Sequence, residues 1–144
     1  MQYNVKQKEL IEAYKATEYR VFSPSITIRI GKVSDELDNL LKENNEEDWA
    51  FITSWNPFGR DCSLEENNRF YDSLLEDISK LKYFEGEGQG IDSTWAPEKS
   101  ILIIGISKSE SIRIGNKYNQ NAILIGKKGN AAELILLDAF VKVI

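Results

Sequence analysis

From residue 49 onward, apolar runs and amphipathic segments alternate in an order that few folds accommodate. Four segments have the length and composition of strands: WAFITSW (49–55), KYFEGEG (82–88), ILIIGIS (101–107) and NAILIG (121–126). Two segments between them have helical spacing, SLEENNRFYDSLLEDISKL (63–81) and SESIRIGNKYN (109–119). The first of these begins with Ser63 and Glu66, the S-x-x-E pattern of a capping box.

The order strand, helix, strand, strand, helix, strand predicts an α+β fold with a ferredoxin-like (split βαβ) antiparallel sheet and helices on one face. Its sheet order is 4-1-3-2, so the first and third strands are central and the second lies at an edge. AFIT and ILIIGI are the apolar segments and YFEGEG is the polar one, as that order requires. GEGQG at the end of the second strand is interpreted as a flexible turn.

The remaining segments are expected to surround this core in a single domain, residues 1–144. The N-terminal addition, 1–48, is predicted to contain a helix, a strand and a second helix, at 6–17, in RVFSPSITIRIG (20–31), and in SDELDNLLKEN (34–44) with Val33 on its apolar face. The ferredoxin-like core spans 49–137 and includes an extra C-terminal strand after a turn at Lys127, Lys128 and Gly129. A C-terminal tail covers 138–144.

Composition excludes several classes of function. A formal charge of −5 argues against general nucleic-acid binding, and no apolar run is long enough for a membrane span. The absence of histidine removes the commonest general base and zinc ligand. The lone Cys62 and the polar N-terminal segment predict a cytoplasmic protein, and no cofactor or metal is expected.

Polar residues follow or precede several predicted strands at one end of the sheet. Trp55 and Asn56 end the first strand, and Trp95 to Ser100 begin its antiparallel neighbour. Gln120 and Asn121 precede the fourth strand at the same end. We therefore expect these segments and the start of the long helix to meet.

Asn67 interrupts the apolar stripe of that helix, four residues before Tyr71 and seven before Leu74. A buried amide without partners costs roughly 1 to 3 kcal/mol, so Asn67 needs hydrogen bonds. We predict that its partners lie near Asn56 and the loop that follows it.

Together these residues resemble the bacterial family known as domain of unknown function 3293, over about Tyr14 to Leu136. The matching motifs are Tyr14-x-x-Thr17-x-Tyr19, FIT-x-WNPF (51–58), Glu66-Asn67, Trp95-x-x-Glu98-x-Ser100 and Gln120-Asn121-Ala122. The family implies no established activity. Lys99 stands where a second acidic residue is usual, which argues against a two-carboxylate metal site, and Asn119 replaces a glycine at a helix C-cap.

The first functional hypothesis is a domain that binds a small polar or anionic molecule, such as a nucleotide derivative, to sense, carry or sequester it. Aromatic walls and amides suit a planar hydrogen-bonding ligand, and Arg60 with the helix start at Ser63 suits its negative end. The expected ligand-binding residues are Trp55, Asn56, Arg60, Asn67, Trp95, Glu98, Ser100, Gln120 and Asn121.

Three alternatives stay open. The tryptophan and amides can instead serve as a strand stop and as structural ties for a loop. An enzyme of phosphoester or amide chemistry would use Glu98 as acid and base, although a salt bridge of Glu98 with Arg60 or Lys99 is the commoner arrangement, and the sequence leans against an enzyme. A protein-interaction domain, or a homodimer, would use the apolar C-terminal strand.

Overall fold

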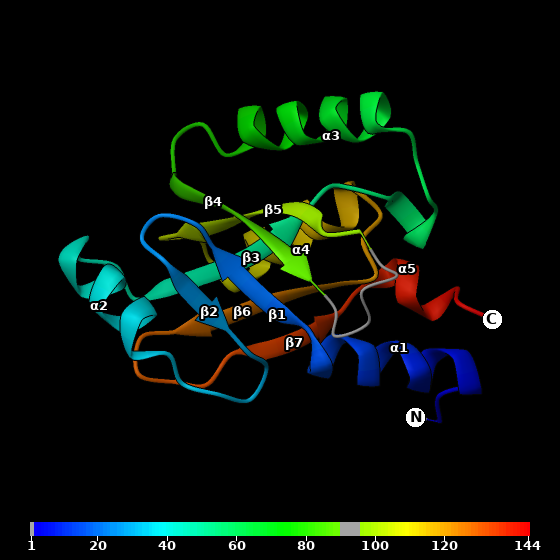
Figure 1. Ribbon diagram of the computed structural model, residues 1–144, viewed down its shortest axis with the longest axis horizontal. Helices are drawn as coiled ribbons and strands as arrows, with labels where there is room; N and C mark the ends of the chain where they lie inside the picture. Colours follow the sequence, from blue (N-terminus) through cyan, green and yellow to red (C-terminus); the bar gives the residue numbers. More distant parts are fainter. Residues whose placement is uncertain (1, 90–95) are drawn as a thin grey trace.

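In a computed structural model that describes residues 2–89 and 96–144, seven strands form one curled antiparallel sheet (Figure 1). The sheet order is β2-β1-β4-β5-β3-β6-β7. The strands are β1 (Glu18–Val21), β2 (Ile26–Ile28), β3 (Asp48–Thr53), β4 (Lys82–Gln89), β5 (Glu98–Ile104), β6 (Ala122–Lys127) and β7 (Glu133–Leu136). The helices are α1 (Val5–Ala16), α2 (Asp35–Glu43), α3 (Leu64–Asp77), α4 (Lys108–Lys117) and α5 (Asp138–Val141), with a short 3-10 turn η1 (Pro57–Gly59). An α+β fold built on an antiparallel sheet is therefore confirmed.

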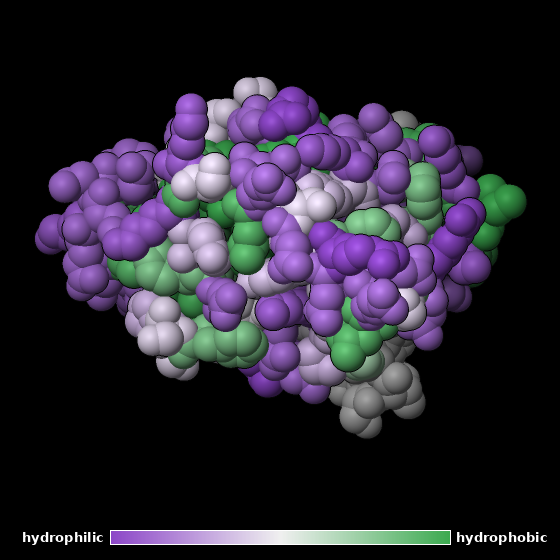
Figure 2. Space-filling view, turned by 90° about the horizontal axis from the view of Figure 1, so that it is seen from above, coloured by the Kyte–Doolittle hydropathy of each residue, from purple (hydrophilic) through white to green (hydrophobic). Residues whose placement is uncertain are grey.

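The central strands are buried on both faces because each contributes alternate side chains to two separate cores. On the outer face, Ile101 and Ile103 of β5 pack with Tyr71, Leu74 and other residues of α3 and α4. The side of the molecule that carries α3 is mainly hydrophilic, with hydrophobic residues exposed in small separate areas (Figure 2). The amphipathic helix over 63–81 is thus confirmed in type, although α3 ends at Asp77.

The inner face of the sheet is also covered, which corrects the expectation of helices on one face only. Leu37, Leu40 and Leu41 of α2 are buried there against Leu102 and other side chains of β1, β2, β3, β5 and β6. Ser34 caps α2 through the backbone N–H of Leu37, as its sequence predicts. Val33, expected on the apolar face, precedes the helix and is 52% exposed.

The N-terminal segment forms two strands where the sequence predicted one. Val21 and Ile26 are partners in a hairpin of β1 and β2, with Pro24 in the turn between them. Strand β1 also pairs with β4, so β4 is an internal strand and the expected edge position is wrong. Gly86, interpreted as part of a flexible turn, lies inside β4, where a Cβ would come within 2.0 Å of the Arg20 carbonyl oxygen.

The curl brings the two outer strands of the sheet, β2 and β7, towards each other. Ile30, just after β2, forms a parallel bridge with Ala132, just before β7. The N-terminal helix α1 lies beside the C-terminal helix α5 (Figure 1). The Gln7 side-chain amide donates to the Phe140 carbonyl, and the Tyr3 and Phe140 rings pack edge to face. The C-terminal segment thus packs on its own chain. No helix among residues 2–89 and 96–144 combines the length and apolar character needed to cross a bilayer.

Candidate functional site

The loop after β3 turns through an unusual run of left-handed residues. Asn56, Phe58 and Gly59 have φ values of 52°, 60° and 69°. Such values are uncommon for residues other than glycine, so surrounding interactions must hold the loop in place. The Phe58 N–H donates to the Asn119 carbonyl at 2.8 Å, and the Gln120 amide donates to the Trp55 carbonyl at 2.9 Å. The segment before β6 therefore fixes the loop from one side.

Asn56 and Asn67 hold the loop from the other side through reciprocal hydrogen bonds. The Asn56 backbone N–H donates to Asn67 Oδ1 at 2.9 Å, and Asn67 Nδ2 donates to Asn56 Oδ1 at 2.9 Å. Asn56 Oδ1 also accepts from the Cys62 N–H at 3.0 Å. Asn67 is 3% exposed, so the predicted buried amide and its predicted partner are both confirmed.

The remaining donor of Asn56 reaches the first residue of β5. Asn56 Nδ2 donates to Glu98 Oε2 at 2.9 Å. Among the described residues Glu98 forms no ion pair. Burial raises the pKa of the Glu98 carboxyl above its ordinary value of 4.5, and the hydrogen bond from Asn56 only partly opposes this effect.

Two tyrosines from the N-terminal segment lie close to this carboxylate. Tyr19 occupies the same row across the sheet as Glu98, separated from it only by Gly88. The Tyr19 hydroxyl donates to the Tyr14 carbonyl at 3.0 Å. Burial first, and in part the charge of Glu98, raise the pKa of Tyr14 to about 12, while the Asn121 side chain acts in the opposite direction. Burial raises the pKa of Tyr19 as well. We call Tyr14, Tyr19, Glu98 and Asn121 the Glu98 cluster.

Several buried polar atoms at this corner lack a hydrogen-bond partner. Within the described part of the chain these are Ser54 Oγ, Trp55 Nε1 and Asn121 Oδ1. All three follow β3 or precede β6, but they do not share one place: Trp55 packs against the core on the α3 and α4 face of the sheet, whereas Asn121 belongs to the Glu98 cluster. An unpaired buried polar group costs roughly 1 to 3 kcal/mol, so each of these atoms lowers the stability of the fold.

The other predicted site residues are placed differently. The Gln120 amide donates to two backbone carbonyls, and the Ser100 hydroxyl donates to the Glu98 carbonyl, so both serve the local backbone. The Arg60 guanidinium is exposed and lies 5.4 Å from the centre of the Phe58 ring. Trp95 lies outside the described residues.

The expected salt bridge of Glu98 with Arg60 or Lys99 does not form. Lys99 follows Glu98 directly in β5, so its side chain leaves the opposite face of the sheet and lies 4.3 Å from the centre of the Tyr71 ring. Sequence analysis did not place Tyr14 and Tyr19 in the site. The signal was present in the motif Tyr14-x-x-Thr17-x-Tyr19, but without β1 in the predicted sheet these residues had no expected position near Glu98.

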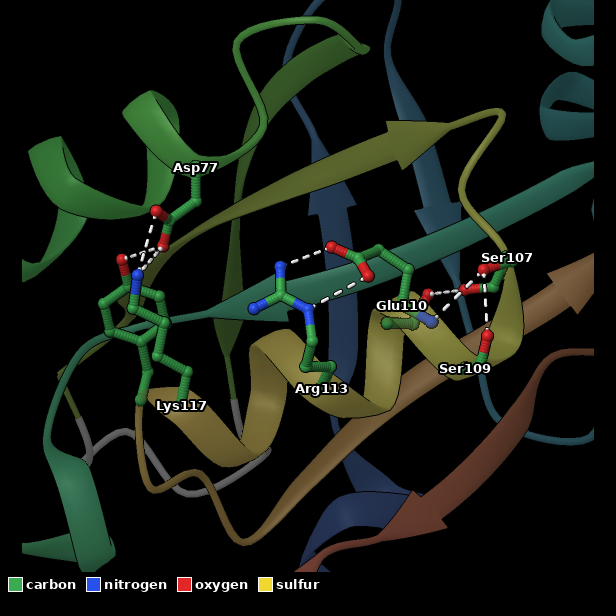
Figure 3. A network of polar contacts seen from close by, with 8 residues as sticks. Asp77, Ser107, Ser109, Glu110, Arg113 and Lys117 are labelled. Atoms are coloured by element: carbon green, nitrogen blue, oxygen red, sulfur yellow. Dashed lines mark hydrogen bonds and ion pairs between the residues drawn. The ribbon is translucent and has the colours of Figure 1, made fainter.

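A second polar network joins α3 to α4 on the surface (Figure 3). Asp77 accepts hydrogen bonds from Lys117 at 2.8 Å and from the Tyr118 hydroxyl at 2.5 Å. Burial opposes ionisation of Asp77, but these two donors outweigh it and lower its pKa. Lys117 pairs with Asp77 and Arg113 pairs with Glu110, so the charges of this network are balanced within it. We interpret the network as an attachment between the two helices.

Two surface recesses lie away from the Glu98 cluster. One, of about 460 Å³, is lined by residues around Trp49 and Gly126, and the other by residues around Phe22 and Tyr83. Among residues 2–89 and 96–144, no three Asp, Glu or Cys side chains are grouped closely enough to hold a metal ion.

Comparison with known proteins places the chain in a family. Searches among curated proteins and among solved structures found no match. A family model described as "Protein of unknown function (DUF3293)" matches residues 52–123, which is half of the 144 residues. The matched span contains the β3 loop, Asn67, Glu98 and Asn121, whereas Tyr14 and Tyr19 precede it. The chain belongs to the family of proteins of unknown function DUF3293.

Proposed function

We propose that this protein binds a small polar molecule at the Glu98 cluster. The observation that carries the proposal is the buried, unpartnered Asn121 Oδ1 in the cluster that also holds Glu98, whose carboxylate has one neutral donor and no ion pair among the described residues. Buried polar groups in native proteins are almost always hydrogen-bonded, and a ligand that supplies the missing partners recovers part of their desolvation cost.

The ligand is a molecule that combines a flat or apolar part with hydrogen-bonding groups. Tyr14 and Tyr19 offer aromatic surface, and Asn121 Oδ1 offers an acceptor. A nucleobase or nucleoside fits this set and is the first class to test. The support for a phosphate is weaker, because the N-terminus of α3 is already capped by Ser63 and Glu66.

The test starts with protein purified gently from its own host. Native mass spectrometry before and after denaturation should detect a stoichiometric small molecule and identify it. An Asn121→Ala variant should lose this molecule, because it removes the unpaired acceptor, while Asn68→Ala on the exposed side of α3 should keep it. Equal occupancy in both variants, or no response of the Asn121 side-chain amide to a nucleobase and amine library in NMR titrations, would refute binding at this site.

A second candidate function is catalysis with Glu98 as general acid and base. The raised pKa of this carboxyl favours it, since acid–base catalysts work best with a pKa near the working pH. Once a ligand is known, Glu98→Gln should abolish its turnover and leave the affinity for a neutral ligand largely intact. If that ligand is never converted by the wild-type protein, the enzyme hypothesis fails.

We also propose three finer assignments. The core of β3, α3, β4, β5, α4 and β6, with its order β4-β5-β3-β6, is a ferredoxin-like unit, supported by the antiparallel pairing of these four strands. The protein works in the cytoplasm, supported by its single cysteine. Self-association through the outer edge of β7 is tested by sedimentation of the wild type over a range of protein concentrations, and a constant monomer mass would refute it.

A further inference from the structure

We infer that the group bound against Glu98 is a positively charged nitrogen, either a primary ammonium or a guanidinium. This inference rests on the proposed function, since it names the chemical class of the ligand at the same site. The inference is drawn from the charge of Glu98, the positions of the nearby cations and aromatic rings, and the hydrogen-bond acceptors around the carboxylate.

The first step is the charge. In the described residues, the Glu98 carboxylate receives one side-chain hydrogen bond, from Asn56, and no ion pair. A carboxylate has about four lone-pair positions, and the described residues fill one of them. Asn56 is a neutral donor, and it cannot balance a negative charge in a partly buried position.

The second step is that the protein's nearby cations are committed elsewhere. Lys99 lies over the Tyr71 ring on the opposite face of the sheet, and Arg60 lies over the Phe58 ring. Arg20, beside Tyr19 in β1, pairs with Glu18 and donates to Gln89. A cation that lies against ionised Glu98 therefore has to come from a bound molecule rather than from these side chains.

The third step is the aromatic surface. Tyr19 and Glu98 lie in one row of the sheet with only Gly88 between them, and a Cβ at Gly88 would meet only the Tyr19 ring, at 3.6 Å. The charge of Glu98 contributes to raising the pKa of Tyr14, so Tyr14 lies near the carboxylate. Aromatic rings beside a carboxylate are the arrangement that recognises cationic nitrogen, because the ring face and the carboxylate both attract positive charge.

The fourth step is the remaining hydrogen-bonding capacity. The Tyr19 hydroxyl is used as a donor to the Tyr14 carbonyl, while Asn121 Oδ1 is an acceptor with no partner. Glu98 and Asn121 Oδ1 therefore both present acceptor positions to a bound group. Ammonium and guanidinium groups carry several N–H donors and no acceptor, so they match this set.

The experiment uses pairs of probes with the same shape and different charge. Methylguanidinium and its neutral isostere methylurea are titrated separately into the full chain at pH 7.5, with the Asn121 side-chain amide as the NMR reporter. The Asn121→Ala variant assigns the amide signal. Butylguanidinium and butylurea extend the comparison to a longer chain, and cytosine serves as the neutral nucleobase probe.

We expect the cationic probe of each pair to bind at least about tenfold more tightly, which is the typical advantage of a charged over a neutral hydrogen-bonded pair. Glu98→Gln should abolish this preference. Glu87→Gln is the matched control, because it removes the same charge from the neighbouring strand on the other face of the sheet, opposite Lys99, and it should keep the preference. Circular dichroism checks that each variant is folded, and Glu98→Ala, which also removes the charge, replaces Glu98→Gln if the latter does not fold.

The possible results separate the two proposals. If methylurea or cytosine perturbs the reporter as strongly as methylguanidinium does, the binding function stands and the inferred charge of the ligand is wrong. If the preference for cations persists in Glu98→Gln, another group carries the charge and the inference is also wrong. If no probe perturbs the cluster, the proposed function itself fails.

Discussion

Replacing Asn67 should destabilise the protein far more than its helical position alone would suggest. Asn67→Ala removes two reciprocal hydrogen bonds with Asn56, both of 2.9 Å, and leaves the Asn56 N–H without its acceptor. Two net hydrogen bonds at about 1 kcal/mol each, plus the cost of the unpaired group, give a loss of roughly 2 to 4 kcal/mol. Asn56 Oδ1 keeps its bond from the Cys62 N–H, so the estimate does not include that interaction.

Urea unfolding followed by both circular dichroism and tryptophan fluorescence measures this loss. With a slope of roughly 2 kcal/mol per molar urea, the middle of the typical range, the midpoint should fall by about 1 to 2 M. Asn68→Ala is the matched control, since Asn68 is exposed on the same turn of α3 and alanine is the better helix former. If the free energies of unfolding of the two variants agree within about 0.5 kcal/mol, the argument from buried amides is refuted.

Asn67→Asp adds a pH dependence to the same test. The carboxylate keeps the acceptor for the Asn56 N–H but places negative charge against Asn56 Oδ1, which raises the pKa of the new carboxyl in the folded state. A group whose folded pKa is raised stabilises the fold most below its unfolded pKa. The destabilisation should therefore be smallest in acid and should grow as the pH rises through the folded pKa. A loss independent of pH would contradict this reasoning.

Three further outcomes are expected. Glu98→Gln should raise the free energy of unfolding at pH 7, because the pKa of Glu98 is raised in the fold. For the same reason the wild type should lose stability above about pH 4.5, and the variant should not. Urea titrations from pH 4 to 8 measure both effects, and an unchanged profile would contradict the reasoning. Gly86→Ala should cost more than about 3 kcal/mol or prevent folding, because its Cβ would lie 2.0 Å from the Arg20 carbonyl oxygen. Gly88→Ala should fold, because the nearest atom to its Cβ is in the Tyr19 ring at 3.6 Å. Equal melting temperatures of the two variants would contradict this expectation. Asp77→Asn should cost about 1 kcal/mol at pH 7. The cost should shrink as the pH falls below 3.8 and through the lowered folded pKa of Asp77, because a carboxyl with a lowered pKa stabilises the fold only while it is ionised; exposed Asp72→Asn is the control.

Local patterns predicted the helices and the central strands well, because they depend on spacing within a few residues. The capping box at Ser63 and Glu66 and the apolar stripe of α3 are both found in the structure. Strand β1 was missed because its four residues, EYRV, carry two charges and are too short for alternation to be visible. The error in the position of β4 follows directly from that omission, since β1 is the strand that covers its edge.

The site was predictable where a single residue violated its local pattern. Asn67 on an apolar stripe required polar partners, and the loop at Asn56 provides them. The surroundings of Glu98 were not predictable in the same way, because they depend on which strands are neighbours. The expected salt bridge of Glu98 with Lys99 failed because β5 begins at Glu98, before the predicted strand start at 101, and consecutive residues of a strand face opposite sides.

The hydrogen bonds at this corner divide its polar residues into two groups with different tasks. Asn56, Asn67 and Gln120 use their amides on one another and on the backbone, so they stabilise the loop without any ligand. Glu98 contributes in the opposite sense, because a buried carboxylate with one neutral donor favours the unfolded state at neutral pH. Stability alone would be served better by glutamine at this position. A charge that costs stability is explained if a bound molecule compensates it, so Glu98→Gln should make the protein more stable and less able to bind.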